Sequence, residues 1–386
     1  MKTIVIVGGG YGGVALAKAL EKQHHSDDSV RILLIEAKSH FYHTVGGLRA
    51  AVQDLDDVVF IPYANVFTSS RHQVVHATVN RFDKKAVYLD SVTQDGGDQI
   101  AYDFLVIATG TNYAAPARIE CAEMDQGKQQ LQQIRQQIKQ ARHVLIVGGG
   151  PVGIELAGEL KDANLKDQQV TLIHSQSQLG HPSYMPLKVH HKLVHLMTSH
   201  GIQVLLDDKV DLPPSSSGTM VVVPSTPLAT SHKGADLSSV DLIVMATGNR
   251  PSPQWIQASV PDLLQSDNYV KVKPTLQVDH PDFPNLFVLG DIAGLDEAKL
   301  AYRAANGHTP VVAANINTLL TNGTHLKEYK KGIDIMLITF GKSNGVTILP
   351  WGIVLGGWMS SLIKSKTLFY DRYWKELNQP VPNSLK

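Results

Sequence analysis

The same strand, glycine turn and helix pattern occurs twice in this chain. The segments IVIVGGGYGG (residues 4–13) and VLIVGGGPVG (residues 144–153) each place an apolar strand directly before a glycine-rich turn. Two further apolar segments, FLVIATG (104–110) and LIVMATG (242–248), follow at similar spacing in the two halves. A strand, a tight glycine turn and a helix in this order begin a nucleotide-binding βαβ unit. The repetition therefore predicts an α/β fold with two Rossmann-like domains.

The first turn has the spacing of a dinucleotide-binding fingerprint. Gly8, Gly10 and Gly13 stand between an apolar strand and a helix, and Glu36 ends the next strand. The glycines permit a tight turn, close approach of the backbone to a pyrophosphate, and packing of helix on strand. An acid at the end of the second strand accepts hydrogen bonds from the adenosine ribose. We therefore expect a bound dinucleotide here.

The second turn, with Gly148, Gly150 and Gly153, repeats the glycines but lacks the acid. Its next strand ends in His174-Ser175, where a carboxylate would select an unphosphorylated ribose. Without a carboxylate a 2′-phosphate is not repelled, and no adjacent arginine requires one. We therefore expect this half to accept either NADH or NADPH.

Two dinucleotide sites in one chain predict one fixed cofactor and one exchanging donor. A flavin is the natural acceptor to stack against a nicotinamide. The segment NLFVLGD (285–291) predicts a strand that ends in Asp291, an acid able to bind ribityl hydroxyls. A helix predicted from Lys299 to Leu320 would direct its positive end at a reduced flavin.

These patterns divide the chain into four segments. We expect the first part of an FAD-binding domain at residues 1–115 and an inserted NAD(P)H-binding domain at 116–252. The second part of the FAD domain follows at 253–325, and a small C-terminal α+β cap, a separate strand-then-helix tail, occupies 326–386.

Three stretches inside these segments carry local signals. Residues 72–105 predict short antiparallel strands with a turn at Gly96-Gly97, and residues 211–236, rich in Pro, Ser and Gly, predict a matching loop. The glutamine-rich stretch 126–140 repeats Leu131, Ile134 and Ile138 at helical spacing. That spacing favours an amphipathic helix over a disordered tract.

Charge and cysteine content exclude several functions. The 35 basic residues balance the 35 acidic ones, so no overall field favours nucleic acid as a partner. The single cysteine, Cys121, excludes the redox-active cysteine pair of a disulfide reductase. His191 and His195 are four residues apart without a third ligand, so we expect no metal.

The N-terminus and the tail bear on localisation. The chain begins MKT and enters an apolar strand at once, without a secretory signal or a Met-Gly myristoylation motif. The uncharged residues between Lys342 and Lys364 are interrupted by glycines and Pro350, which favours a buried strand-turn-helix over a transmembrane span. An interfacial patch stays open. We expect a cytoplasmic or peripheral membrane-associated protein.

The two GGGxxG turns, the two ATG segments and the LGD motif together resemble the flavoproteins with two dinucleotide-binding domains, the pyridine nucleotide-disulfide oxidoreductase fold. Within it, LRA (48–50), VTLIHSQ (170–176) and LIKSKTLF (362–369) are similar to segments of the apoptosis-inducing-factor homologues and ferroptosis suppressor proteins. The resemblance covers essentially the whole chain. It implies an FAD enzyme that oxidises NADH or NADPH and reduces a ubiquinone-type quinone, with naphthoquinones also open.

The resemblance further implies roles for individual residues. Catalytic roles near the flavin and quinone fall on Glu155, Lys364 and Phe369. The residues implied for FAD are Gly8, Gly10, Gly12, Gly13, Glu36, Arg49, Val74, Thr109, Gly110, Gly290 and Asp291. Those implied for NAD(P)H are Gly148, Gly150, Gly153, His174 and Gly248.

From the residues alone, non-catalytic roles stay open for the three catalytic candidates. Glu155 is also compatible with a solvated or helix-capping role, Lys364 with a solvated basic surface, and Phe369 with the core. Glu159, one helical turn after Glu155, is assigned no role.

Two other functions stay open as well. One is an NADH-sensing flavoprotein that acts through partner contacts, and the other is a reductase of a small electron-transfer protein. A membrane-borne quinone and a homodimer through the C-terminal region also remain open.

Overall fold

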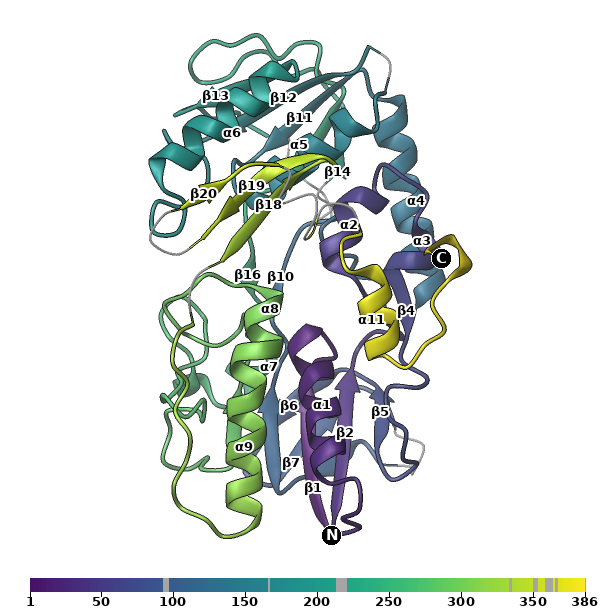
Figure 1. The fold of residues 1–386 in the computed structure, drawn as a ribbon, viewed down its shortest axis with the longest axis vertical. Helices are drawn as coiled ribbons and strands as arrows, with labels where there is room; N and C mark the ends of the chain where they lie inside the picture. The colour runs from purple at the N-terminus through teal and green to yellow at the C-terminus, as the bar shows by residue number, and fades with distance from the viewer. Residues whose placement is uncertain are drawn as a thin grey trace.

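The computed structural model describes residues 1–92, 97–165, 167–212, 221–332, 335–349, 353–357, 364 and 367–385. Two sheets lie at opposite ends of the molecule, the N-terminal one at the bottom of Figure 1 and the second at the top. Each has parallel central strands followed by helices, which confirms the predicted α/β class.

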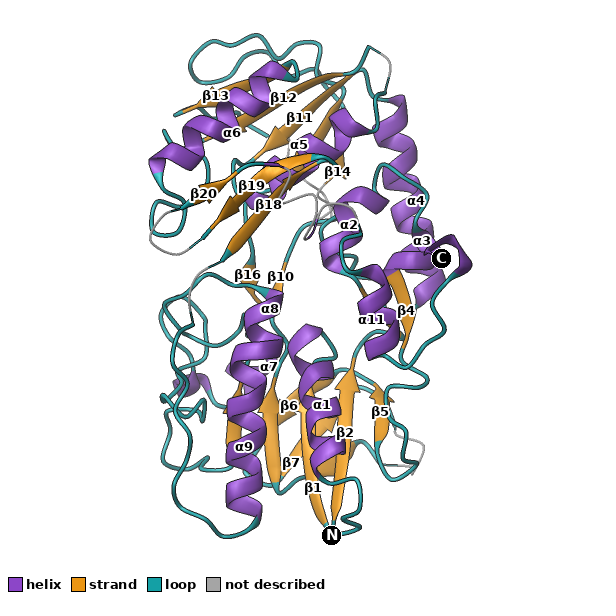
Figure 2. Ribbon diagram, viewed as in Figure 1, coloured by secondary structure: helices purple, strands orange, loops and turns teal. Residues whose placement is uncertain are grey.

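The N-terminal sheet consists of β1 (Lys2–Val7), β2 (Val30–Glu36), β5 (Gln73–His76), β9 (Phe104–Ile107) and β17 (Leu286–Val288). Its strand order is β17-β9-β1-β2-β5, and all neighbours are parallel. Ile4 and Ile6 of β1 are fully buried against α1 (Tyr11–Gln23) and α9 (Thr309–Leu320), which cover one face (Figure 2). Continuous apolar strands suit a sheet that is covered on both faces.

An antiparallel sheet covers the other face and interrupts the chain before β9. It consists of β6 (Val79–Phe82), β7 (Ala86–Leu89) and β8 (Gln99–Ala101). The predicted antiparallel strands are confirmed here with one correction, because β5 pairs in parallel with β2 and belongs to the main sheet. Gly96 of the predicted turn lies outside the described residues.

The second sheet repeats the plan. Its strands and helices are β11 (His143–Val147), β12 (Gln169–His174), β13 (Ile202–Leu206), β14 (Val221–Val222), β15 (Leu242–Met245), α4 (Met124–Gln140), α5 (Pro151–Asp162) and α6 (Leu187–Ser199). The strand order is β13-β12-β11-β15-β14, and all neighbours are parallel except β14, which is antiparallel to β15. Leu131, Ile134 and Ile138 of α4 are buried, which confirms the predicted amphipathic helix. Residues 213–220 of the predicted loop are outside the described part.

The chain leaves the N-terminal sheet after β9 and returns to it at β17. On the way out and back, β10 (Thr111–Asn112) and β16 (Arg250–Pro251) pair antiparallel. The second sheet therefore lies within an insertion in the first unit, while the residue limits of the four predicted segments stay predictions. Further described elements before residue 265 are β3 (His40–Tyr42), β4 (Phe60–Pro62), α2 (Thr44–Ala50), α3 (Asp56–Val59), α7 (Gln254–Ser259) and a 3₁₀ turn (Pro261–Leu263).

The predicted helix from Lys299 to Leu320 begins at Ala301 and is not uniform. After α8 (Ala301–Arg303) it widens into a π-helical turn (Ala304–His308) before α9. In this turn His308 Nδ1 accepts a hydrogen bond from the Gly290 N–H at 3.0 Å, and its Nε2 lies 2.8 Å from Glu297. The π turn thus holds the Gly290-Asp291 segment in place.

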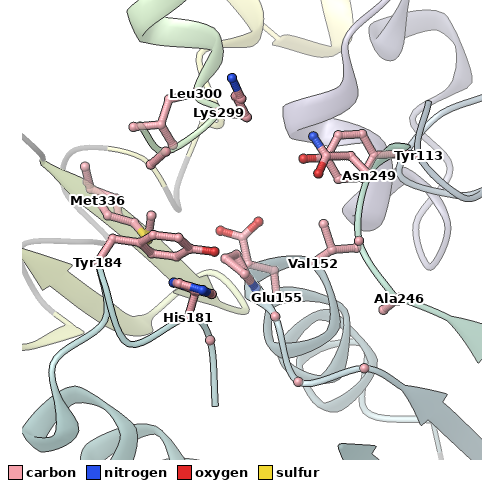
Figure 3. Close-up of a pocket in the computed structure, with 18 of the residues that line it drawn as sticks. Tyr113, Val152, Glu155, His181, Tyr184, Ala246, Asn249, Lys299, Leu300 and Met336 are labelled. Carbon is pink, nitrogen blue, oxygen red and sulfur yellow. The ribbon is translucent and has the colours of Figure 1, made fainter. Parts of the chain in front are cut away.

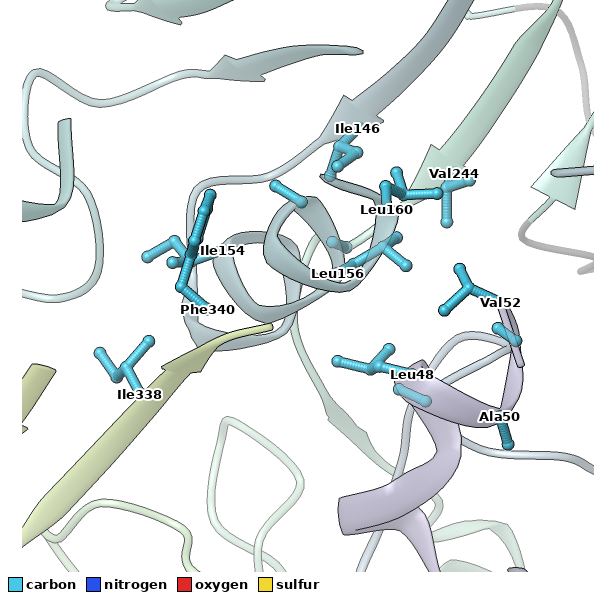
Figure 4. Close-up of a cluster of buried hydrophobic side chains, with 14 of the residues drawn as sticks. Leu48, Ala50, Val52, Ile146, Ile154, Leu156, Leu160, Val244, Ile338 and Phe340 are labelled. Carbon is cyan, nitrogen blue, oxygen red and sulfur yellow. The ribbon is translucent and has the colours of Figure 1, made fainter. Parts of the chain in front are cut away.

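The tail is a strand-then-helix unit, as predicted, but it is not separate from the two domains. It contains β18 (Met336–Phe340), β19 (Asn344–Ile348), β20 (Val354–Leu355), α11 (Tyr370–Glu376) and a 3₁₀ turn (Asn383–Leu385). Strand β18 packs on α5, which lies between β18 and α2 in Figure 4. Gly158 permits this contact, because a Cβ there would lie 2.5 Å from Phe340 Cα.

The helical part of the tail packs on the N-terminal domain instead. Tyr373 and Trp374 of α11 are buried, and Trp374 Nε1 donates to the Val58 carbonyl at 2.9 Å. Within the described ranges, no helix is both long and apolar enough to cross a membrane. Much of the uncharged stretch after Lys342, including Trp351 and Trp358, falls outside those ranges.

Candidate functional site

Both glycine turns expose backbone at the end of a parallel strand. Gly8 and Gly148 have φ values of +107° and +124°, in the region that favours glycine. A Cβ at Gly10 or Gly150 would meet nothing within 4 Å. At Gly13 and Gly153 a Cβ would collide with the carbonyls of Gly8 and Gly148. The middle glycines thus face open space, whereas the last ones allow the helix to pack closely.

A cavity of about 320 Å³ lies at the first turn. The residues predicted for FAD that line it are Gly8, Gly10, Gly12, Glu36, Thr109, Gly110, Gly290 and Asp291. Glu36 stands at the end of β2 and accepts a hydrogen bond from the Gly9 N–H at 2.5 Å. The carboxyl ends of the parallel strands and the start of α1 meet here, and this arrangement suits a pyrophosphate.

Buried polar groups of this cavity fit a hydroxyl-rich ligand. Thr109 Oγ1 is buried and finds no hydrogen-bond partner among the described residues. Asp291 is half-buried, and desolvation raises the pKa of its carboxyl against the opposing effect of Lys299. Such groups gain stability when a ligand supplies hydrogen bonds. The residues present therefore fit FAD.

Sequence reasoning missed two cations in this cavity, Lys38 and Arg118. Burial lowers the pKa of Lys38 to about 8, and Arg118 acts in the same direction. A bound phosphate group would raise the pKa of Lys38 again, because a nearby anion favours the charged lysine. Lys38 follows Glu36 by two residues, but its sequence position carries no signal of its burial.

Three residues that the resemblance assigned to FAD do not line the cavity, namely Gly13, which serves helix packing, Val74 and Arg49. Val74 of β5 packs against the core of the N-terminal sheet. Arg49 of α2 is 2% exposed, and its guanidinium donates to both carboxylate oxygens of Glu159 on α5 at 2.9–3.1 Å. Arg49 thus joins the two domains, and Glu159, which was assigned no role, is its partner.

A larger cavity of about 1700 Å³ lies between the second glycine turn and the tail. The predicted residues Gly148, Gly150, His174 and Gly248 line it, whereas Gly153 serves packing. Burial lowers the pKa of His174, whose Nε2 has no partner within the described part of the chain. The lowered pKa favours the neutral ring. Lys209 and Tyr184, which sequence reasoning missed, also line this cavity.

The two cavities have several described lining residues in common, and the charged ones among them are Glu155, Lys299 and Lys364. Lys364 Nζ lies 2.6 Å from Glu155 Oε1, and the same oxygen accepts a hydrogen bond from the Thr339 N–H at 3.0 Å. In Figure 3 the Glu155 carboxylate points into the cavity between Tyr184 and Val152. Phe369 lines the larger cavity only. Glu155 and Lys364 are thus brought together where the two cavities adjoin, whereas Phe369 is placed on the wall of the larger cavity.

The fold and these sites can be set beside known proteins. A family model for pyridine nucleotide-disulphide oxidoreductases matches residues 2–307. The chain belongs to this family.

Curated relatives within this flavoprotein group match almost the full length. Apoptosis-inducing factor homolog B of Dictyostelium discoideum is 31% identical, over 99% of this chain and 98% of the relative. Ferroptosis suppressor protein 1 of Xenopus tropicalis is also 31% identical, over 98% and 96%. The predicted resemblance is confirmed, and this pyridine nucleotide-disulphide oxidoreductase uses FAD as cofactor and NAD(P)H as electron donor.

Solved structures show the same fold. The sulfide:quinone oxidoreductase of Aquifex aeolicus superposes with a TM-score of 0.72 at 18% identity, covering 100% of this chain and 94% of that one. The CoADR-RHD protein of Bacillus anthracis gives 0.65 at 19% identity, covering 98% of this chain and 64% of that one. At these identities the likeness concerns the fold alone.

Replacing Asp291 with alanine is expected to give largely colourless protein. The half-buried carboxylate lines the smaller cavity and is suited to binding flavin hydroxyls, so its loss removes a charge-assisted hydrogen bond. The flavin absorbance per chain after purification measures the effect. Asp291→Asn, which keeps the shape and one acceptor, should retain more flavin. Full loading of the alanine variant would remove Asp291 from the site.

Proposed function

We propose that this chain is an FAD-dependent NAD(P)H:quinone oxidoreductase that reduces a ubiquinone-type quinone by two electrons. The observation that carries the proposal is the position of Glu155 and Lys364, which line both cavities. Because these two side chains line both cavities, they can act on an acceptor that enters the larger cavity and meets the cofactor held in the smaller one.

The cysteine content supports a small acceptor that needs no thiol. Cys121 is the chain's only cysteine; its thiol lies 3.4 Å from Gln130 Oε1, and it does not line the described part of either cavity. A quinone requires apolar walls and a donor for its oxygen rather than a nucleophile. Met336, Leu337, Leu349 and Phe369 supply apolar wall in the larger cavity.

The chain's own residues position the reactants and compensate charge. Bound FAD supplies the redox chemistry, taking two electrons from the nicotinamide and passing them to the acceptor. Lys364 carries an ammonium that can donate a hydrogen bond to the quinone oxygen on which negative charge develops. Glu155 and the Leu337 carbonyl, 2.6 and 3.3 Å from Nζ, orient that ammonium in advance.

The shared cavity also supports an order of events. The nicotinamide turn and the apolar wall line one continuous space, which supports an order in which the oxidised nucleotide leaves before the quinone binds. Each cycle consumes NAD(P)H, one proton and the quinone, and releases NAD(P)⁺ and hydroquinone. This is ping-pong kinetics, which predicts parallel lines in double-reciprocal plots.

The test is the rate of NADH and NADPH oxidation with a short-chain ubiquinone, compared with the rate in oxygen alone. A large quinone-dependent increase supports the proposal and ranks the two nucleotides. Rapid flavin reduction without reoxidation by either acceptor contradicts it. That outcome would favour the NADH sensor or the reductase of an electron-transfer protein.

A further inference from the structure

The tail turn that carries Phe369 into the larger cavity has an unfavourable backbone. Leu368 and Phe369 have φ values of +47° and +60°, the left-handed region that bulky residues rarely adopt. Phe369 is also the N-cap residue of α11, directly before Tyr370. Two such residues in succession cost free energy and persist only where surrounding contacts hold them.

A buried histidine from another part of the chain holds it. His43, which precedes α2, is fully buried, and its Nε2 lies 2.7 Å from the Leu368 carbonyl oxygen. Because a carbonyl can only accept, Nε2 must carry the proton. Burial lowers the pKa of His43 to about 4, so the ring is neutral and Nδ1 is a bare acceptor.

Tyr11 fixes this tautomer. It is the first residue of α1, directly after the glycine turn, and its hydroxyl lies 3.1 Å from His43 Nδ1. The same oxygen accepts hydrogen bonds from the Val45 N–H at 3.1 Å and the Thr44 hydroxyl at 3.2 Å. With those two donors in place, the Tyr11 proton is directed to His43. The His43 N–H is thereby directed at the tail.

Aromatic contacts fix the plane of the ring. The His43 ring centroid lies 5.4 Å from that of Tyr370 and 4.9 Å from that of Tyr373, both on α11. Helices α2 and α11 lie side by side in Figure 1. His43 thus has restricted freedom to turn away from Leu368.

The turn is joined to the catalytic lysine as well. The Leu368 N–H donates to the Lys364 carbonyl at 2.8 Å, and Lys364 reaches Glu155 as described above. A continuous set of contacts therefore runs from Tyr11 beside the flavin cavity, through His43 and the tail, to Glu155 of α5.

We propose that His43 is a positioning residue, which holds the left-handed Leu368–Phe369 turn and so places Phe369 and Lys364 for the electron acceptor. It acts through the Leu368 carbonyl and does not line the described part of either cavity. The effect of His43 on the electron acceptor rests on the proposed quinone reduction, whereas its role in holding the turn does not.

The test compares two variants of nearly equal size. His43→Gln keeps an N–H that can reach the Leu368 carbonyl, and His43→Met removes it. Leaving that carbonyl unpaired should raise the KM for the quinone about tenfold in the Met variant, with kcat and flavin reduction by NADH changing less than about threefold. The Gln variant should stay near the parent protein.

A second readout does not depend on the acceptor. In FAD-loaded protein, amide hydrogen exchange across residues 367–373 should be faster in the Met variant and near normal in the Gln variant. His43→Phe, which keeps the aromatic packing, replaces the Met variant if that protein does not fold.

The outcomes separate the two proposals. The role of His43 is overturned if amide hydrogen exchange across residues 367–373 is unchanged in His43→Met and His43→Phe. It is also overturned if His43→Gln and His43→Met have equal effects. Faster exchange with an unchanged quinone KM overturns its influence on the acceptor. If the parent protein does not reduce quinones, the proposed function fails, while exchange still decides whether His43 holds the turn.

Discussion

Replacing Lys364 with methionine should lower kcat/KM for the quinone by about 100-fold, the usual effect of removing one preorganised donor to a developing negative charge. The ammonium lines both cavities and is paired there with Glu155, with side-chain exposures of 16% for Lys364 and 14% for Glu155. Stopped-flow reduction of the flavin by NADH should stay within about threefold of the parent protein, because the donor half-reaction does not need this charge.

A surface lysine of the same tail provides the control. Lys375 lies on α11, its side chain is 69% exposed, and it pairs with Asp371 at 3.2 Å. Exposed ion pairs of this kind contribute little to the free energy of unfolding. Lys375→Met should therefore leave both half-reactions unchanged. Unaltered quinone kinetics in Lys364→Met would remove Lys364 from the acceptor site and leave its contact with Glu155 as a structural one.

Replacing Arg49 with methionine should destabilise the protein by about 3 kcal/mol, because it leaves the buried Glu159 carboxylate without its charged partner. Both side chains are 2% exposed, and the guanidinium donates to both carboxylate oxygens. Burial already raises the pKa of Glu159 against the opposing effect of Arg49. The measurement is the thermal midpoint of the FAD-loaded protein at one scan rate.

The double variant Arg49→Met with Glu159→Met separates a clamp between α2 and α5 from a flavin contact. Replacing both members of a buried ion pair with apolar residues is often close to neutral, so the double variant should recover most of the lost stability. If Arg49 instead acts on FAD, as the resemblance implied, both Arg49 variants should lose flavin and Glu159→Met alone should keep it. That result would contradict the clamp.

Local patterns were sufficient for the two nucleotide-binding units. The turn at Gly8 requires a positive φ, and Gly10 must leave open space for a ligand, so the residue types follow from the backbone itself. Glu36 lies at the cavity because it ends the strand that follows the first helix. The helix of residues 124–140 was equally visible from its 3.6-residue spacing, since Leu131 and Ile138 face the core.

The cavity cations and the partners of the ion pairs were not predictable in this way. Lys38 follows Glu36 closely, yet its burial depends on segments far along the chain, including the Ile119 carbonyl to which it donates. Arg49 was assigned to FAD by resemblance, but a 110-residue separation gives no local signal that Glu159 meets it. The tail was interpreted as separate because its contacts with α5 and with the N-terminal domain are all long-range.

The amino-acid order alone therefore indicated the chemistry of this protein: two dinucleotide sites, a flavin, a nicotinamide donor and no cysteine relay. These features depend on φ, on strand ends and on residue type, which are local properties. The meeting of Lys364 with Glu155, and of His43 with Leu368, depends on folding, because the partners are 209 and 325 residues apart. Helical or strand periodicity selects a face but not a neighbour, so contacts over such separations arise only when the tail packs on both domains.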